Sequence, residues 1–376
     1  MSLTDLQAAT QVSLPTLRHT IQELSDTGWV CPVGRSSSTG GRRATLYGLD
    51  GETHLIVGVH LELPAINMVT IGLDGQIVDY VHLPGDEARL PDDALKRIGN
   101  YVQRVKTTHP NRQILGIGVA TPGYIDPPSG QILSIGRVPH WQNFPLKARL
   151  EADLDLPVTV ENDIDCMTSV ELAHADLPAT ADVLYLGFSE GVKVSMLLGG
   201  RLYKGPFGNA GLIGRTAAAL QDEVETSEGH KYLNETMSVG SVCQAFDQRM
   251  VLQPDRSEAL DNIAALTERS AKFQAILDAA ENEPICRAIV VEIVDFLAVE
   301  LSNLVYILQP EMLIIGGALS NMPFGFRTYL ENSIRKLLPS LISNHLLIKY
   351  GSMTGTRVAA VGAAHRFLQY YNIPDA

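Results

Sequence analysis

The sequence has few cysteines and none of the spacings that cysteine chemistry uses. Its 376 residues include four cysteines, and no two of them form a CxxC or another paired spacing. This scarcity argues against a disulfide framework and against a cysteine zinc site. It suits a reducing cytoplasm, where we expect the protein to be located. The four are Cys31, Cys166, Cys243 and Cys286.

Long apolar runs are also missing. No stretch approaches the roughly 18 uninterrupted apolar residues that a membrane-spanning helix requires, and the first ten residues, MSLTDLQAAT, lack the charged-then-apolar order of a signal peptide. With 45% hydrophobic and 19% charged residues, the composition is that of an ordinary globular protein of two or three domains. We expect no membrane partner.

Positive charge is scarce for a protein that would bind nucleic acid. The net charge is −13, from 29 lysines and arginines against 42 acids. The first 50 residues carry four basic and four acidic side chains, so the whole negative excess lies in residues 51–376. Because phosphates repel an acidic surface, the N-terminal segment is the one plausible contact for DNA.

Two short helical patterns open the chain. Ser2 and Ser13 are placed to cap them, and Pro15 stands in the first turn of the second, a favoured position for proline. Spacing of i, i+4 and i+7 predicts the buried face of this second helix. That face consists of Leu17, Ile21 and Leu24.

The segment VGRSSSTGGRRATLY (residues 33–47) has three arginines and no acid. A helix pair followed by such a ribbon suits duplex DNA, because a helix enters the major groove while thin arginine-bearing backbone reaches the minor groove. The pattern predicts a winged helix-turn-helix head in residues 1–50. The alternative is an amphipathic helical hairpin used for packing. The predicted DNA contacts are Pro15, Thr16, Arg18, His19, Gln22, Arg35, Arg42 and Arg43.

This head is smaller than others of its class. Winged helices usually bury another helix before such a pair, and here only Met1 precedes Ser2. We therefore expect a truncated head with a small core. Either the true start lies upstream or a neighbouring element replaces the missing helix.

From about His54 the chain repeats one order of elements. The first copy has strands at HLIVGVHL, INMVTIGL and QIVDYVHL, a helix at Pro91–Thr107, strand ILGIGVA, a helix at Phe144–Asp153 and strand PVTVEND. The second has strands VLYLGF, KVSMLLGG and RLY, a long helical region, strands EMLIIGG and LLIKYGS, and a C-terminal helix. Such a duplication predicts an α/β, actin-like (ribonuclease H-like) body with its ligand between two lobes. The expected limits are 51–376 for the body, with lobes at 51–175 and 176–355 and the C-terminal helix at 356–376.

Five segments of this body resemble the ROK family of repressors, open reading frames and sugar kinases. They are GIGVATPGYIDPPSGQIL, PHWQNFPL, LPVTVENDIDC, GRLYKGPFGNAGLIG and LQPEMLIIGGAL. The resemblance covers essentially the whole chain, and the N-terminal extension is similar to that of the regulator branch.

The phosphate-binding loops of the family's kinases are replaced here. Where the family has an Asp-Ile-Gly-Gly-Thr-like loop, the chain reads Val59-His60-Leu61-Glu62-Leu63-Pro64, and the second, Gly-Thr-Gly-like loop reads Phe188-Ser189-Glu190-Gly191. Proline removes an amide donor and the glutamates oppose phosphate. Gly316-Gly317 remains, where we favour tight packing over nucleotide approach. We expect kinase activity to be lost and no cofactor to be bound.

The resemblance also implies a ligand site. Asn162-Asp163 matches the family's sugar-binding asparagine and catalytic aspartate, although an Asx turn is the alternative. Arg137 and Arg215 stand where the family has an asparagine and a zinc-site histidine, and Asn234 replaces a glutamate. Two gained arginines favour an anion such as a phosphosugar or sugar acid over a neutral sugar, unless both lie on the surface.

The family's structural zinc site is not expected here. The usual cysteine cluster is absent, and His230 within SEGHKYLNET is an isolated histidine. One histidine cannot supply four zinc ligands.

Together these features predict a transcriptional regulator, a repressor, whose non-catalytic body senses a small metabolite. We expect operator DNA and a sugar, phosphosugar or sugar acid as its partners. We also expect a homodimer or homotetramer, because paired heads read a pseudo-palindrome better than one. The alternatives are an ATP-dependent sugar kinase with an added head, and a ligand-independent interaction protein.

Overall fold

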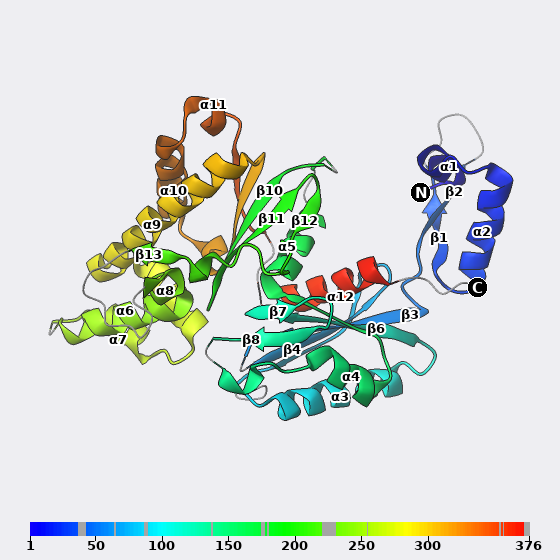
Figure 1. The fold of residues 1–376 in the computed structure, drawn as a ribbon, viewed down its shortest axis with the longest axis horizontal. Helices are drawn as coiled ribbons and strands as arrows, with labels where there is room; N and C mark the ends of the chain where they lie inside the picture. Colours follow the sequence, from blue (N-terminus) through cyan, green and yellow to red (C-terminus); the bar gives the residue numbers. More distant parts are fainter. Residues whose placement is uncertain are drawn as a thin grey trace. The chain divides into compact units, whose positions relative to one another are not determined.

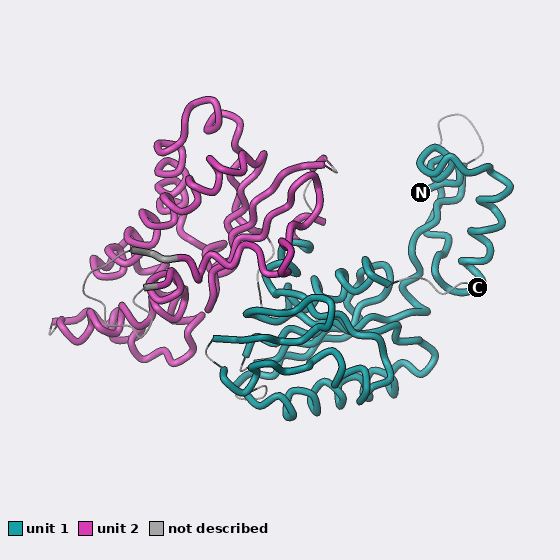
Figure 2. The backbone as a smooth tube through the Cα atoms, in the orientation of Figure 1, with its two compact units in different colours: residues 1–170, 355–376 teal, residues 171–354 magenta. Residues whose placement is uncertain are grey.

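The computed structural model describes residues 1–36, 43–63, 65–85, 89–136, 138–173, 177–178, 180–219, 231–253, 255–352, 355 and 357–371, without the side chains of 217–219 and 231. The chain divides into two units (Figure 2). The first unit is Met1–Val170 with Gly355–Ala376, and the second unit is Glu171–Thr354. Among the described residues, no helix has the length and apolar character needed to cross a membrane.

A helix pair and a hairpin form the start of the chain (Figure 1). The Ser2 backbone amide donates to Asp5 Oδ2 at 2.8 Å and the Asp5 amide donates to Ser2 Oγ at 3.2 Å, which confirms the predicted cap. The Ser13 hydroxyl likewise accepts from the Thr16 amide at 3.4 Å. The elements are α1 (Leu3–Thr10), α2 (Leu14–Asp26), β1 (Val30–Arg35) and β2 (Thr45–Leu49), the strands being antiparallel.

The first residues of the chain run beside this hairpin. The Tyr47 amide donates to the Met1 carbonyl at 2.8 Å, and Ser2 forms an antiparallel bridge with Leu46. This segment therefore covers one edge of β2.

The first unit is built on a five-stranded sheet in the order β5-β4-β3-β6-β9. β3 is antiparallel to β4 and parallel to β6, and β6 is parallel to β9. The core between this sheet and α3 and α4 includes the fully buried Trp141. The elements are β3 (His54–Leu61), β4 (Ile66–Gly72), β5 (Ile77–Leu83), α3 (Pro91–Thr108), β6 (Gln113–Thr121), β7 (Tyr124–Asp126), β8 (Gln131–Ser134), η1 (Pro139–Trp141), α4 (Leu146–Leu154), β9 (Val158–Asn162), α5 (Asp163–Ala173) and α12 (Val358–Tyr370).

The second unit repeats this topology with the order β12-β11-β10-β15-β16. β10 is antiparallel to β11 and parallel to β15, which is parallel to β16. The repeated strand order confirms the predicted duplication and the α/β class. The elements are β10 (Val183–Phe188), β11 (Val192–Leu198), β12 (Arg201–Tyr203), η2 (Ile213–Arg215), β13 (Ala217–Ala219), β14 (Lys231–Tyr232), η3 (Leu233–Glu235), α6 (Val239–Val251), α7 (Glu258–Ala265), α8 (Arg269–Ala279), α9 (Pro284–Leu308), β15 (Met312–Gly317), η4 (Ala318–Asn321), α10 (Phe324–Leu337), α11 (Ser340–Ser343) and β16 (Leu347–Tyr350).

The C-terminal helix α12 packs on the sheet of the first unit, on the face opposite α3 and α4 (Figure 1). Gly58 on β3 and Gly118 on β6 permit this approach, because a Cβ at either would overlap the carbonyl of Ala360 or Ala363. The C-terminal helix therefore belongs to the first unit, together with the sheet on which it packs.

Some elements of the first unit were absent from the sequence prediction. The hairpin β7–β8 follows β6, and α5 begins at Asp163 directly after β9. The acidic residues Asp163 and Asp165 in its first turn are favourable beside the positive end of the helix dipole, so α5 did carry a sequence signal.

Candidate functional site

The predicted DNA-facing residues of α2 all lie on its exposed side. Leu17 is buried at 8% exposure, and Ile21 and Leu24 are half-buried on the other side, as the helical spacing predicts. The five exposed residues are Pro15, Thr16, Arg18, His19 and Gln22.

Several of these side chains already have polar partners. His19 Nε2 lies 3.3 Å from Glu23 Oε1, and the Gln22 amide donates to Asp26 Oδ1 at 2.8 Å. Carboxylates beside these residues weaken the positive potential of the α2 surface. Arg18 is the one arginine in α2, and it lies on this exposed face.

The hairpin places two of the predicted arginines at the same end. The Ser36 amide donates to the Ala44 carbonyl at 2.9 Å, and Arg35 pairs with Thr45 across the hairpin. Arg35 and Arg43 are both exposed beside this end. Arg42 lies outside the described residues.

An aromatic cluster joins the N-terminal segment to the sheet of the first unit. The ring of Trp29 stacks on His54, the first residue of β3. Tyr371, just after α12, lies against Trp29 and Phe367. The head is therefore anchored to β3 and to the end of α12.

Asn162 and Asp163 lie where β9 ends and α5 begins. Both are buried, at 3% and 8% exposure. The Ile164 amide donates to Asn162 Oδ1 at 3.0 Å and to Asp163 Oδ1 at 2.8 Å. The Asx-type bond is thus present, and it leaves Asp163 Oδ2 pointing elsewhere.

Asp163 Oδ2 faces His60, which sequence reasoning had not assigned to the site. His60 Nε2 lies 3.8 Å from Asp163 Oδ2, and His60 is 4% exposed. Neither ring nitrogen of His60 has a hydrogen-bond partner among the described residues. The signal available in the sequence was a histidine at the end of a buried strand.

The thiol of Cys166, near Asp163, is not suited to act as a nucleophile. Burial raises the pKa of the Cys166 thiol well above its ordinary value, and the nearby carboxylates of Glu161 and Asp165 raise it further. A thiol with such a pKa stays protonated near neutral pH, and a protonated thiol is a poor nucleophile.

The first loop is held by side chains. The Asn67 amide, fully buried on β4, donates to Glu62 Oε2 at 2.8 Å. Asn67 Oδ1 in turn accepts from the Tyr80 hydroxyl at 3.1 Å. Pro64 lies outside the described residues, but Glu62 is fixed as a negative charge at the start of this loop.

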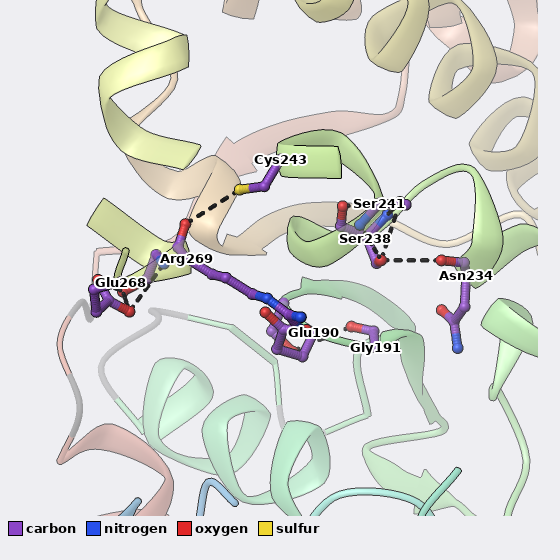
Figure 3. Close-up of polar contacts among 10 residues, drawn as sticks. Glu190, Gly191, Asn234, Ser238, Ser241, Cys243, Glu268 and Arg269 are labelled. Atoms are coloured by element: carbon purple, nitrogen blue, oxygen red, sulfur yellow. Dashed lines mark hydrogen bonds and ion pairs between the residues drawn. The ribbon is translucent and has the colours of Figure 1, made fainter. Parts of the chain in front are cut away.

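The second loop folds on itself (Figure 3). The Ser189 amide and hydroxyl both donate to the Gly191 carbonyl, at 3.0 and 3.1 Å. Glu190 Oε2 lies 3.0 Å from Arg269 Nη1 at the start of α8. The Ser189 amide, which could otherwise contact phosphate, is therefore used within the loop.

Gly316 and Gly317 serve packing. A Cβ at Gly316 would overlap the Tyr185 hydroxyl, and one at Gly317 would overlap the backbone of Phe188. Gly317 also has φ +68°, a conformation that favours glycine. Strand packing accounts for both glycines, as the sequence analysis favoured.

Arg215 and Asn234 are neighbours within the second unit. The Arg215 guanidinium lies 4.0 Å from the ring centroid of Tyr232 and is exposed. Asn234 Oδ1 accepts from the Val192 amide at 2.9 Å, and Figure 3 shows its carbonyl bonded to Ser238. Asn234 therefore fixes β11, while the position of Arg215 leaves it accessible.

Arg137 and His230 lie outside the described residues. In the part of the chain that the structure does describe, no group of three or more histidine, cysteine or acidic side chains could hold a metal ion. The predicted ligand residues fall into two pairs, Asn162–Asp163 in the first unit and Arg215–Asn234 in the second.

Relatives of the chain include both repressors and kinases. It is 26% identical over 326 residues to the xylose repressor of Caldicellulosiruptor bescii, covering 85% of this chain and 80% of that protein. It is 28% identical over 314 residues to the β-glucoside kinase of Klebsiella pneumoniae, covering 83% of this chain and 95% of that protein.

Solved structures have the same fold. A ROK family transcriptional regulator, a homologue of the E. coli MLC protein, has a TM-score of 0.78 at 16% identity and covers 98% of this chain and 92% of its own. The ROK family glucokinase of Streptomyces griseus has a TM-score of 0.68 at 20% identity, and the match covers 83% of this chain and 98% of the glucokinase. The ROK family model matches residues 56–369, most of the chain. The chain therefore belongs to the ROK family.

Proposed function

We propose that the chain is a transcriptional repressor that binds operator DNA through its N-terminal head and senses a small metabolite through a non-catalytic body. The observation that carries this proposal is the segment before the family match. It consists of two helices and an arginine-bearing hairpin, with the exposed face of α2 carrying the predicted contacts. A helix face and a hairpin wing are elements that read DNA grooves. The repressors among the relatives support the same assignment.

The body is non-catalytic in this proposal because the two segments that match the family's phosphate loops are unsuited to bind the triphosphate of ATP. Glu62 and Glu190 stand in the segments that match the family's two phosphate loops, and the Ser189 amide is used by its own loop. Phosphoryl transfer needs backbone amides and cations around the phosphates. These loops would instead repel a nucleotide.

The effector in this proposal is a sugar or an anionic sugar derivative. The names of the relatives, a xylose repressor and a β-glucoside kinase, support a carbohydrate. Asn162 and Asp163 would contact it, and Arg137, Arg215 and Asn234 remain predicted ligand contacts. The protein would act in the cytoplasm as a homodimer or homotetramer, because two linked heads gain affinity for a two-fold operator.

Fluorescence anisotropy on a fragment from upstream of its own gene tests the DNA-binding part. We expect binding that an unlabelled random fragment does not displace at equal concentration. Arg18→Ala should weaken it at least tenfold, whereas Arg201→Ala, an exposed arginine on the edge strand β12, should leave it unchanged. Failure of wild-type protein to bind any fragment would refute the proposal.

A kinase is the second candidate, favoured by the β-glucoside kinase relative, which the match covers almost completely. A coupled phosphorylation assay with ATP and a sugar panel decides between them. Turnover that disappears in Asp163→Asn would establish a kinase. We expect no turnover above background. An interaction protein without a ligand is the outcome if neither DNA nor any sugar binds.

A further inference from the structure

The parallel strands of the first unit end beside one another. His60 pairs with Ala120 across β3 and β6, and Thr121 pairs with Asn162 across β6 and β9. In open α/β sheets, ligands bind outside the carboxyl ends of such strands. His60, Asn162 and Asp163 therefore meet at the edge of the sheet where a ligand would be bound.

His60 is unusual within this group because neither of its ring nitrogens has a hydrogen-bond partner among the residues that the structure describes. Buried polar groups are almost always hydrogen-bonded, so each exception in a native protein requires an explanation. The imidazole is 4% exposed and lies beside the N-terminus of α5, an eleven-residue helix. Its Nε2 is directed at Asp163 Oδ2, at 3.8 Å, which is too long for a direct hydrogen bond.

In our inference, one small group bridges the two side chains. Asp163 Oδ1 already accepts from the Ile164 amide, whereas Oδ2 faces His60. An oxygen about 2.8 Å from both Nε2 and Oδ2 would complete a triangle with them. That group must accept a hydrogen bond from the imidazole N–H and donate one to the carboxylate, which can only accept.

A hydroxyl meets both requirements, whereas a carboxylate or phosphate oxygen can only accept and would be repelled by Asp163. We propose that His60 is a ligand-contacting residue that, with Asp163, recognises a single hydroxyl of a neutral sugar. This inference rests on the proposed function as a sugar sensor. At this position it favours a neutral ligand over the phosphosugar or sugar acid that Arg137 and Arg215 had suggested.

One substitution distinguishes a role of His60 in ligand contact from a role in packing alone. His60→Leu fills the same space without a polar atom, so it removes the unpartnered group and its contact with the ligand together. We expect the variant to unfold at the same or a higher temperature than wild type. We also expect it to bind sugar at least tenfold more weakly. A packing role would instead lower stability and leave affinity unchanged.

Isothermal calorimetry on the full chain provides the binding measurement. The probes are D-xylose, D-glucose, its 2-, 3-, 4- and 6-deoxy derivatives, D-glucuronate and glucose 6-phosphate. One deoxy sugar should lose about tenfold in affinity for wild type, equivalent to one hydrogen bond, yet bind His60→Leu no more weakly than glucose does. His60→Gln, which retains a donor and an acceptor, should restore part of the loss, and His345→Gln, at an exposed histidine, should change nothing.

Each result distinguishes the inference from the function on which it rests. Sugar binding that His60→Leu leaves unchanged overturns the role of His60 but retains the sugar sensor. Tighter binding of glucuronate or glucose 6-phosphate than of glucose overturns the preference for a hydroxyl. If no probe binds wild type, both the inference and the sugar-sensing function fail, while DNA binding is judged separately by anisotropy.

Discussion

The indole of Trp29 lies almost flat on the imidazole of His54, with ring centroids 4.4 Å apart and planes inclined by 17°. His54 Nδ1 also lies 3.0 Å from the Gly28 carbonyl, and the ring of Tyr371 lies against the indole, with 6.0 Å between centroids. The pair connects the segment before the family match with the first strand of the family fold.

Replacing the indole should loosen the head and spare the lobe. We expect Trp29→Ala to lower the free energy of opening the junction by about 2 kcal/mol, since a half-buried aromatic contact is lost. Hydrogen exchange should become faster in α1, α2 and the hairpin, with β6 unchanged. Trp29→Phe, which retains a stacked ring, should show about half the effect. Unchanged exchange in the head would mean that the stack does not anchor it.

Substitutions in the hairpin and in helix α2 should have different effects on how DNA binding depends on salt and on DNA sequence. If Arg43 contacts phosphate as we propose, Arg43→Ala should weaken binding to every sequence and make the salt slope smaller by about 0.9. Arg18→Ala should alter the preference among operator variants, because base contacts carry the sequence information. Anisotropy titrations at several salt concentrations measure both. Equal behaviour of the two variants would show that this assignment of surfaces is wrong.

A buried ion pair should affect stability strongly when one partner is removed. Arg366 Nη2 on α12 lies 3.6 Å from Glu161 Oε1 on β9, and both side chains are almost fully buried. Arg366→Met removes one buried partner of the Glu161 carboxylate, so we expect a loss of about 3–5 kcal/mol in unfolding free energy. The double variant with Glu161→Leu should recover much of it. Urea denaturation measures the unfolding free energy of each variant. If the losses of the two single variants simply add in the double variant, the two side chains are not coupled.

The buried thiols should resist modification while the protein is folded. Burial raises the pKa of both Cys243 and Cys286 to about 11. At pH 8 only about one molecule in a thousand then carries either thiolate. We expect a maleimide to label the half-buried Cys31 and to leave Cys166, Cys243 and Cys286 unmodified. Mass spectrometry should count one label on folded protein and four in denaturant.

The same pKa shifts give a stability dependence at high pH. The thiols ionise earlier in the unfolded chain, near pH 9, than in the folded chain, near pH 11. Their contribution is complete below about pH 9 and falls as the pH rises toward 11. The midpoint of urea unfolding should therefore decrease across this interval. Cys243→Ala should reduce the decrease.

Local patterns were sufficient to predict the caps and both sheets. The capping serines, Pro15 and the alternating apolar strands act over a few residues, and the structure contains the elements they predict. The relationship of His60 to Asp163 was not predictable in this way. It depends on strands that are distant in sequence but paired through β6, and on α5 beginning at Asp163.

The position of α12 was likewise not a local property. Its alanine-rich face permits close packing, and the glycines on β3 and β6 that accept it lie far back in the chain. The roles of residues 33–47 and of Arg215 remain predictions, because they concern molecules outside the chain.

One strand runs from the head to the proposed ligand site. β3 begins at His54, beside Trp29, and ends near His60, about 20 Å away at the usual rise per residue. It is hydrogen-bonded to β4 on one side and to β6 on the other, and every residue in it is buried. A slip of one residue would exchange the side chains of its two buried faces, so we expect the strand to move as a whole. A ligand that displaces His60 would therefore shift the base of the head by translating or tilting one rigid strand, without local unfolding between the two ends.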